Sequence, residues 1–141
     1  MRRYLLDTNI LSNATKPQPS EPLVEWLAQQ TDDTLFIASL TFAEIKRGIL
    51  EKPAGKKRRE LEKWFANIAM SLFAGRVLAF DDRAGLIWAR LMAEGTAQGR
   101  PRSPLDMIIA SVAEANDCIL VTDNTQHFTG IKTLNPMRTE S

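Results

Sequence analysis

The stretch LLDTNIL (residues 5–11) places a carboxylate and two small polar residues directly after a short apolar run. The apolar residues 4–6 are few and are bounded by polar residues, which is typical of a strand. Three more runs have this form, at residues 35–38, 77–80 and 118–121. Since each is continuously apolar rather than alternating, we expect strands that are buried on both faces, as in a parallel sheet covered by helices.

Segments with helical periodicity lie between these runs. Apolar residues three and four positions apart predict helices around residues 61–72, 84–92 and 105–113, a shorter one over 42–49, and a short one over 23–27. Strands that alternate with helices predict an α/β fold with layers. A chain of 141 residues fits a single domain, residues 1–141, with a core large enough to fold alone.

The overall charge does not point to an anionic partner. The 18 basic and 17 acidic side chains give a formal charge of +1, so a nucleic acid would have to meet a local patch. The single Cys118 lies in an apolar run and is predicted to be buried in the core. A chain with one cysteine cannot form an internal disulfide, which suits a reducing compartment. No stretch is apolar enough for a signal peptide or a membrane span, so we expect a cytoplasmic protein without a membrane partner.

Four acidic residues fall at junctions between the predicted elements. Asp7 and Asp123 follow strands, whereas Glu44 and Asp106 lie in the first turns of helices. In a parallel α/β sheet, strand ends and helix starts meet at the edge that binds ligands, so we expect these four side chains to converge. Clustered carboxylates repel one another unless a cation neutralises them, and oxygen ligands suit Mg²⁺ or Mn²⁺. Such an ion can activate water for displacement at phosphorus.

Each acid taken alone also fits ordinary local structure. Residues 41–44 have the spacing of a capping box, and so do residues 103–106, with a proline at the first helical position. Asp7 and Asp123 are compatible with simple turn chemistry. Capping does not explain why all four acids fall on one edge, and we therefore favour the metal site.

The sequence lacks the residues that other catalytic or phosphate-binding sites require. His127 is the single histidine, which excludes a nuclease with paired histidines, and no glycine-rich phosphate loop occurs. Arg100 and Arg102 lie in the loop that leads to Asp106, close to the predicted site, where they are candidates to contact a phosphate of RNA.

The motifs together resemble the PIN-domain toxins of toxin–antitoxin systems, in the VapC and FitB branch. The matching pieces, in chain order, are YLLDTNIL, ASLTFAEIKRGI, the FDD of residues 80–82, SPLDMIIASVA and LVTDNTQHF. The resemblance implies a PIN-like three-layer α/β/α fold with a central parallel sheet. It also implies an Mg²⁺- or Mn²⁺-dependent endoribonuclease whose metal is held by Asp7, Glu44 and Asp106.

The fourth acid departs from the family pattern. Family members commonly carry T-x-[N/D]-x-x-[D/E]-F, and here Asn124 and His127 stand at the two positions where this pattern allows an acid. Either Asp123 supplies the fourth ligand from a neighbouring position, or the site works with three acids.

Small polar residues flank both strand-end acids. We expect Thr8 and Asn9 to let the chain turn after Asp7 and to orient its carboxylate by hydrogen bonds. Thr122 and Asn124 are expected to act in the same way at the other strand end. Simple turn chemistry is equally compatible with Thr8.

The resemblance also implies partners. These are an RNA substrate, a protein antitoxin that blocks the cleft, a homodimer that forms a heterotetramer or larger complex with the antitoxin, and DNA bound only through the antitoxin. Two alternatives stay open. One is a PIN-like module that binds RNA or a partner without cleavage, which the altered residues 122–128 favour. The other is a metal-dependent phosphatase that uses the same carboxylates.

Overall fold

A parallel five-stranded sheet forms the centre of the computed structural model, which describes residues 2–138. The strands are β1 (Arg3–Leu6), β2 (Leu35–Ala38), β3 (Val77–Leu78), β4 (Cys118–Val121) and β5 (Thr133–Leu134). Their order across the sheet is β3-β2-β1-β4-β5, and all neighbouring strands are parallel. The predicted α/β fold with a helix-flanked parallel sheet is confirmed.

Helices connect the strands. They are α1 (Thr8–Ala14), α2 (Glu21–Ala28), α3 (Ser39–Leu50), α4 (Lys56–Trp64), α5 (Met70–Leu72), α6 (Asp82–Ala97) and α7 (Pro104–Ala115), with single turns η1 (Asp32–Thr34), η2 (Phe65–Ala69) and η3 (Thr125–Phe128). Within residues 2–138, none of these helices has the length and apolar character needed to cross a membrane.

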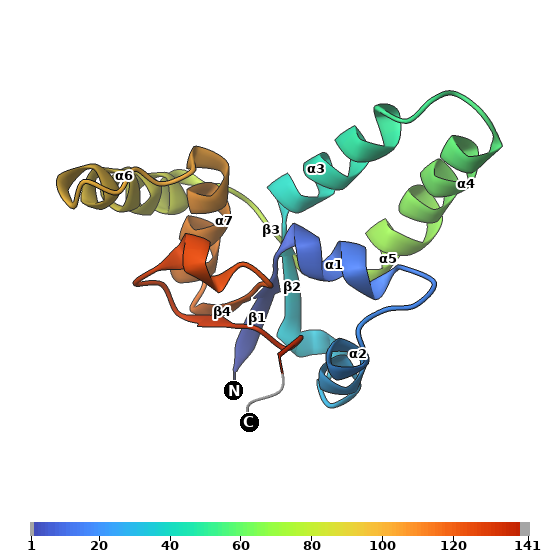
Figure 1. Cartoon of the computed structure of the whole chain (residues 1–141), viewed down its shortest axis with the longest axis horizontal. Coiled ribbons are helices and arrows are strands. Elements are labelled where there is room, and N and C mark those ends of the chain that lie inside the picture. Colours follow the sequence, from blue (N-terminus) through green and yellow to red (C-terminus); the bar gives the residue numbers. More distant parts are fainter. Residues whose placement is uncertain (1, 139–141) are drawn as a thin grey trace.

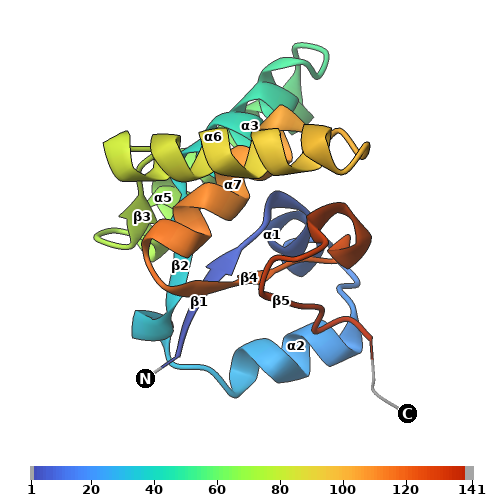
Figure 2. The same ribbon diagram turned by 90° about the vertical axis from the view of Figure 1, so that its left-hand side faces the viewer.

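The two faces of the sheet carry different helices. Leu5 points into a core formed with α6 and α7, whereas Tyr4 and Leu6 point into a second core that includes residues of α1 and α2. Figure 1 shows α6 and α7 on one side of the sheet and α1 to α5 on the other, and Figure 2 shows α6 crossing over α7. Alternate residues of β1 are therefore buried on opposite faces, which explains why the strand is apolar throughout.

The central strand β1 sets the position of the site. It pairs with β2 on one side and with β4 on the other, in a register that places Leu6 opposite Val121. The backbone N–H of Asp7 continues this ladder and donates to the carbonyl of Val121 at 2.9 Å. Because both strands end at the same level, the residues that follow them, Asp7 and Thr122, are neighbours.

The edges of the sheet differ from the sequence prediction. A strand forms in the predicted region 77–80, but it is only the two-residue β3 at the edge of the sheet. The prediction that it is buried is wrong, because Val77 and Phe80 are exposed. The fifth strand, β5, was not predicted. It is too short to show periodicity, and it is held by hydrogen bonds to β4.

The helix predicted around residues 61–72 is interrupted. A π-helical turn, η2, separates α4 from α5, and its extra residue shifts the side chains that follow relative to the helical period. Phe65 is buried as expected, but Ile68 and Leu72 are more than half exposed, at 56% and 52%. Leu105, which was expected in the buried stripe of α7, is also exposed at the start of that helix.

Cys118 is buried in β4, as predicted. Burial raises the pKa of its thiol, and the thiol contacts the backbone carbonyl of Asn116 at 3.6 Å. Both features favour the neutral thiol, so Cys118 acts as a small core residue.

Gly95 in α6 offers a test of how the loop after this helix packs. A Cβ atom at Gly95 would lie 2.9 Å from the carbonyl oxygen of Arg100. We expect Gly95→Ala to lower the free energy of unfolding by about 1–3 kcal/mol, as overpacking does. Gly48 in α3 has no atom within 4 Å of the equivalent position, so Gly48→Ala is the matched control and should stabilise the helix by about 0.5–1 kcal/mol. Urea unfolding measures both, and equal effects would contradict this packing.

Candidate functional site

Asp7 lies at the carboxyl end of the central strand and is 6% exposed. It is the N-cap of α1, where one carboxylate oxygen accepts the backbone N–H of Thr8 at 2.9 Å. The other oxygen accepts the hydroxyl of Thr122, also at 2.9 Å. Both oxygens therefore have a donor from the protein, and the carboxylate is fixed between the ends of β1 and β4.

The environment of Asp7 raises the pKa of its carboxyl group. Burial is the largest cause, and it outweighs the hydrogen bonds from Thr122 and Thr8, which lower the pKa. The negative charges of Asp106 and Glu44 raise it further. These charges come from α7 and α3, so distant parts of the chain place acids close enough to act on Asp7.

Glu44 lies one turn deeper in its helix than the sequence suggested. Helix α3 begins at Ser39 after Ala38, which makes no side-chain cap, so the predicted capping box at residues 41–44 is wrong. Thr41 is buried inside the helix, and its hydroxyl is without a hydrogen-bond partner among the described residues. Glu44 accepts the hydroxyl of Thr8 at 2.8 Å, which holds its carboxylate toward α1.

Asp106 both starts its helix and borders the site. Pro104 opens α7, and the hydroxyl of Ser103 accepts the backbone N–H of Asp106 at 3.3 Å, so the Ser103 half of the predicted capping box is confirmed. The Asp106 carboxylate lies 3.6 Å from Nδ1 of His127 in η3. The backbone of Asp106 thus serves the cap while its side chain remains at the sheet edge.

Asp123 follows β4 and is held by two asparagines. Its backbone N–H donates to the side-chain oxygen of Asn9 at 3.3 Å. Its carboxylate accepts the side-chain amide of Asn135 at 3.4 Å. Sequence reasoning missed Asn135, because an Asn-Pro pair near the end of a chain marks only a turn.

Thr122 joins these groups. It is fully buried, donates to Asp7, and accepts the backbone N–H of Asn124 at 3.1 Å and the side-chain amide of Asn9 at 3.5 Å. Thr8 contacts two acids, Asp7 through its backbone and Glu44 through its hydroxyl. The four small polar residues expected to orient the acids therefore lie beside them, and their functional roles stay predictions.

All four acids line one hollow of about 460 Å³. Its lining comprises Asp7, Thr8, Asn9, Ser12, Asn13, Lys16, Glu44, Asp106, Ile109, Asp123, Asn124 and Met137. We call this the acid hollow. In residues 2–138, no three acidic, histidine or cysteine side chains lie close enough together to surround one metal ion. Sequence reasoning also missed Lys16, which looked like part of an ordinary loop.

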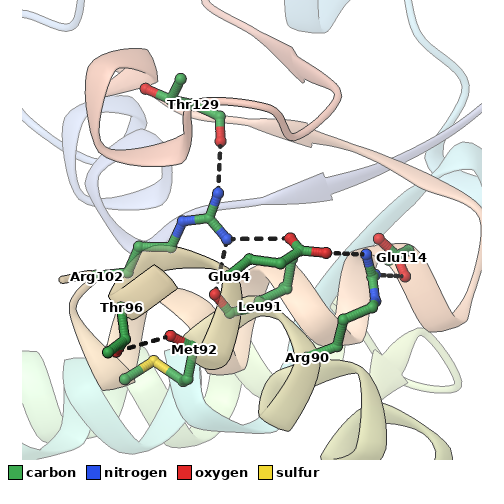
Figure 3. A network of polar contacts seen from close by, with 8 residues as sticks. All are labelled: Arg90, Leu91, Met92, Glu94, Thr96, Arg102, Glu114 and Thr129. Atoms are coloured by element: carbon green, nitrogen blue, oxygen red, sulfur yellow. Dashed lines mark hydrogen bonds and ion pairs between the residues drawn. The ribbon is translucent and has the colours of Figure 1, made fainter. Parts of the chain in front are cut away.

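The two predicted RNA-contacting arginines are placed differently. The side chain of Arg102 is only 14% exposed, and its guanidinium donates to the carbonyls of Leu91 and Thr129 and pairs with Glu94 (Figure 3). Arg100 is exposed and lines a separate hollow that also includes Asp106. A contact with RNA stays a prediction for both.

Comparison with known proteins decides the family. The sequence profile of the family described as "PIN domain" matches residues 4–132. The chain belongs to the PIN-domain family. Its relatives place it among the VapC/FitB-like toxins of type II toxin–antitoxin systems.

Two relatives and one solved structure are similar to this chain over most of their length. The VapC ribonuclease Y4jK of Sinorhizobium fredii is 33% identical over 94% of this chain and 96% of the relative. The toxin FitB of Neisseria gonorrhoeae is 32% identical over 88% and 89%. The solved structure of FitAB bound to the IR36 DNA fragment superposes with a TM-score of 0.91 at 30% identity and covers 98% of both chains.

The structure separates two residues that follow the fourth acid. Asn124 lines the acid hollow, while His127 lies outside it and contacts Asp106 from the neighbouring hollow. Asp123 is therefore the one carboxylate that residues 122–128 bring to the acid hollow.

The raised pKa of Asp7 predicts a pH-dependent effect on stability. An acid whose folded-state pKa lies above its ordinary value of 3.8 destabilises the fold once it ionises, and this penalty is absent below that value. Asp7→Asn should therefore raise the free energy of unfolding at neutral pH, and the gain should shrink as the pH falls toward 3.8. Urea unfolding over a pH series measures this.

Asp33→Asn is the matched control, because Asp33 is exposed and lies outside the acid hollow. A loss of stability in Asp7→Asn that is the same at every pH would show that the hydrogen bonds of the carboxylate, and not its charge, dominate.

Proposed function

We propose that this PIN domain is a metal-dependent endoribonuclease and the toxin of a toxin–antitoxin pair. The observation that carries the proposal is the single hollow that gathers Asp7, Glu44, Asp106 and Asp123 at the carboxyl edge of the sheet. The similarity to a VapC ribonuclease supports the same activity. RNA would be cut to leave a 5′-phosphate and a 3′-hydroxyl.

The residues of the acid hollow fit a hard divalent ion. Their donors are carboxylate oxygens, which suit Mg²⁺ or Mn²⁺. Asp7 is buried, whereas Glu44, Asp106 and Asp123 are partly exposed at the hollow, so a cation that enters it can approach their carboxylates. Asp7, Glu44 and Asp106 would hold the ion and Asp123 would assist. A bound ion of this kind activates water and stabilises the charge that develops at phosphorus.

The neighbouring polar residues prepare the carboxylates for this task. The donors Thr122 and Thr8 favour the charged form of Asp7 and restrict its orientation. Asn135 holds the carboxylate of Asp123 in the same way. Lys16, exposed at the acid hollow, brings a positive charge that an RNA phosphate can approach.

The proposed partners follow those of the relatives. FitAB, which this chain resembles, was solved bound to DNA, and VapBC from Salmonella typhimurium was also solved bound to DNA. We propose that a protein antitoxin covers the acid hollow, that the toxin forms a homodimer within a heterotetramer or larger complex, and that DNA is bound only through the antitoxin.

One rival function has an observation in its favour. His127 stands where the resembling pattern has an acid and Asn124 where it allows one, and within residues 2–138 no three candidate ligands surround a common point. A PIN-like module that binds RNA or a partner without cutting would also have these features.

Cleavage of a labelled RNA pool separates the two functions. We expect cutting with Mg²⁺ or Mn²⁺ and none with EDTA, and a loss of more than about 100-fold in Asp7→Asn and Asp106→Asn, since even groups behind the ligands contribute 10–100-fold. Asp33→Asn, prepared identically, should cut like the parent. A chromogenic phosphate monoester should resist hydrolysis, and its turnover would favour the phosphatase.

If Asp7→Asn cleaves RNA at the same rate as the parent protein, Asp7 is not a catalytic residue. RNA binding without cutting by the parent protein would establish the binding module.

Asp123→Asn tests the fourth ligand. The Asp123 carboxylate already accepts a hydrogen bond from the side-chain amide of Asn135. We therefore expect the cleavage rate to fall by less than about tenfold, which is the low end for a residue that supports metal ligands. The same assay and metals apply. A loss as severe as that of Asp7→Asn would make Asp123 a true fourth ligand.

A further inference from the structure

A second hollow of about 410 Å³ adjoins the acid hollow. All of its lining residues except Pro101 carry polar or charged side chains: Gln98, Arg100, Arg102, Ser103, Asp106, Gln126, His127 and Thr129. Asp106 lines both hollows and therefore stands between them. We call the second one the side hollow.

Arg102 joins the two walls of the side hollow. One wall is the loop between α6 and α7 with the start of α7, and the other is η3 with Thr129, which follows it. The guanidinium of Arg102 donates to the carbonyl of Leu91 at 2.8 Å and to that of Thr129 at 3.2 Å, and pairs with Glu94 at 3.5 Å (Figure 3). Gly95 lets the first loop lie directly on α6. Arg102 is thus a positioning residue that fixes the distance between the walls.

The remaining side chains of the side hollow are accessible. Arg100 and Gln126 are exposed, and the imidazole of His127 is 54% exposed. The contact between Nδ1 of His127 and the carboxylate of Asp106 ties one edge of the ring to the boundary between the hollows. An aromatic ring, a guanidinium and an amide therefore gather within one small depression next to the acids.

These groups match the chemistry of an unpaired nucleotide. Single-stranded RNA is recognised by stacking of splayed bases on aromatic or histidine rings and on arginine planes, and by hydrogen bonds to base edges. The volume is within the range of about 300–1,000 Å³ that holds a small ligand, which suits one nucleotide. A base inside a duplex is already stacked and paired, so it cannot enter.

We infer that the side hollow binds one unpaired nucleotide next to the phosphate cut at the acid hollow, with its base stacked on His127. The inference rests on the proposed endoribonuclease function. Arg100 contacts the backbone phosphate of this nucleotide or stacks on its base, and Gln126 contacts the base edge. The substrate is therefore RNA with a single-stranded segment at the cut.

His127 can report on RNA binding in an NMR experiment. Because the chain has one His, the ring signals of His127 in a proton–carbon NMR spectrum need no assignment by mutation. The Asp7→Asn chain would be titrated at constant pH with ribotetranucleotides of uridine, adenosine, cytidine or guanosine, and with an RNA duplex of mixed sequence. Using Asp7→Asn prevents cutting, so that binding is measured by itself.

We expect a saturable upfield shift of the His127 ring signals with at least one single-stranded RNA, nuclear Overhauser effects between the ring and that RNA, and neither effect with the duplex. Adding Arg100→Ala should weaken the affinity by about tenfold or more, as the loss of a charge-assisted contact does. Arg59→Ala, which removes an exposed cation of α4 that lines neither hollow, should leave the affinity within about twofold at moderate salt.

Two results would overturn the inference. One is RNA binding that shifts other signals and leaves those of His127 unchanged. The other is an affinity that falls equally in Arg100→Ala and Arg59→Ala. Either could occur in a protein that cuts RNA, so the nuclease would survive. Conversely, RNA could stack on His127 although the parent protein does not cut RNA. That result would support the nucleotide site at the side hollow and reject the proposed nuclease activity.

Discussion

The hydrogen bond from Thr122 to the buried carboxylate of Asp7 is the contact on which the site depends. It joins the ends of β1 and β4, and it is possible because the parallel register ends both strands at the same level. A buried carboxylate oxygen without a donor would carry a large desolvation penalty. Thr122 removes part of that penalty, and the chain can therefore keep an acid at the centre of its sheet.

The same carboxylate creates a tension between stability and function. Each acid is held locally, Glu44 by Thr8 and Asp123 by Asn135, while the acids act on Asp7 with like charge. Local hydrogen bonds therefore stabilise an arrangement that repels itself as a whole. A cation at the acid hollow would relieve this repulsion, and this physical argument supports the metal-dependent activity that we propose.

The sequence predicted most of this arrangement, and its failures have physical causes. Strand ends at Asp7 and Asp123 could be predicted because short apolar runs end abruptly there. Glu44 was misplaced by one turn, because residues 41–44 have the spacing of a cap although the helix begins at Ser39 and buries Thr41. Asn135 lies outside the reach of any local pattern, since it meets Asp123 only after β5 has joined the sheet.

Arg100 and Arg102 show why packing, and not residue type, decides a role. Both lie in one loop, carry the same charge and were predicted to contact RNA. The guanidinium of Arg102 donates to the carbonyls of Leu91 and Thr129 and pairs with the carboxylate of Glu94, and these contacts hold the loop. Arg100, in contrast, is exposed at the side hollow. A fixed wall and an accessible cation are both needed if the side hollow is to select a nucleotide, because a loop that moved would lose the spacing between Arg100, His127 and the acids. Arg102, which is mostly enclosed, thus holds the loop that presents Arg100, and substitution of either should affect RNA binding for a different reason.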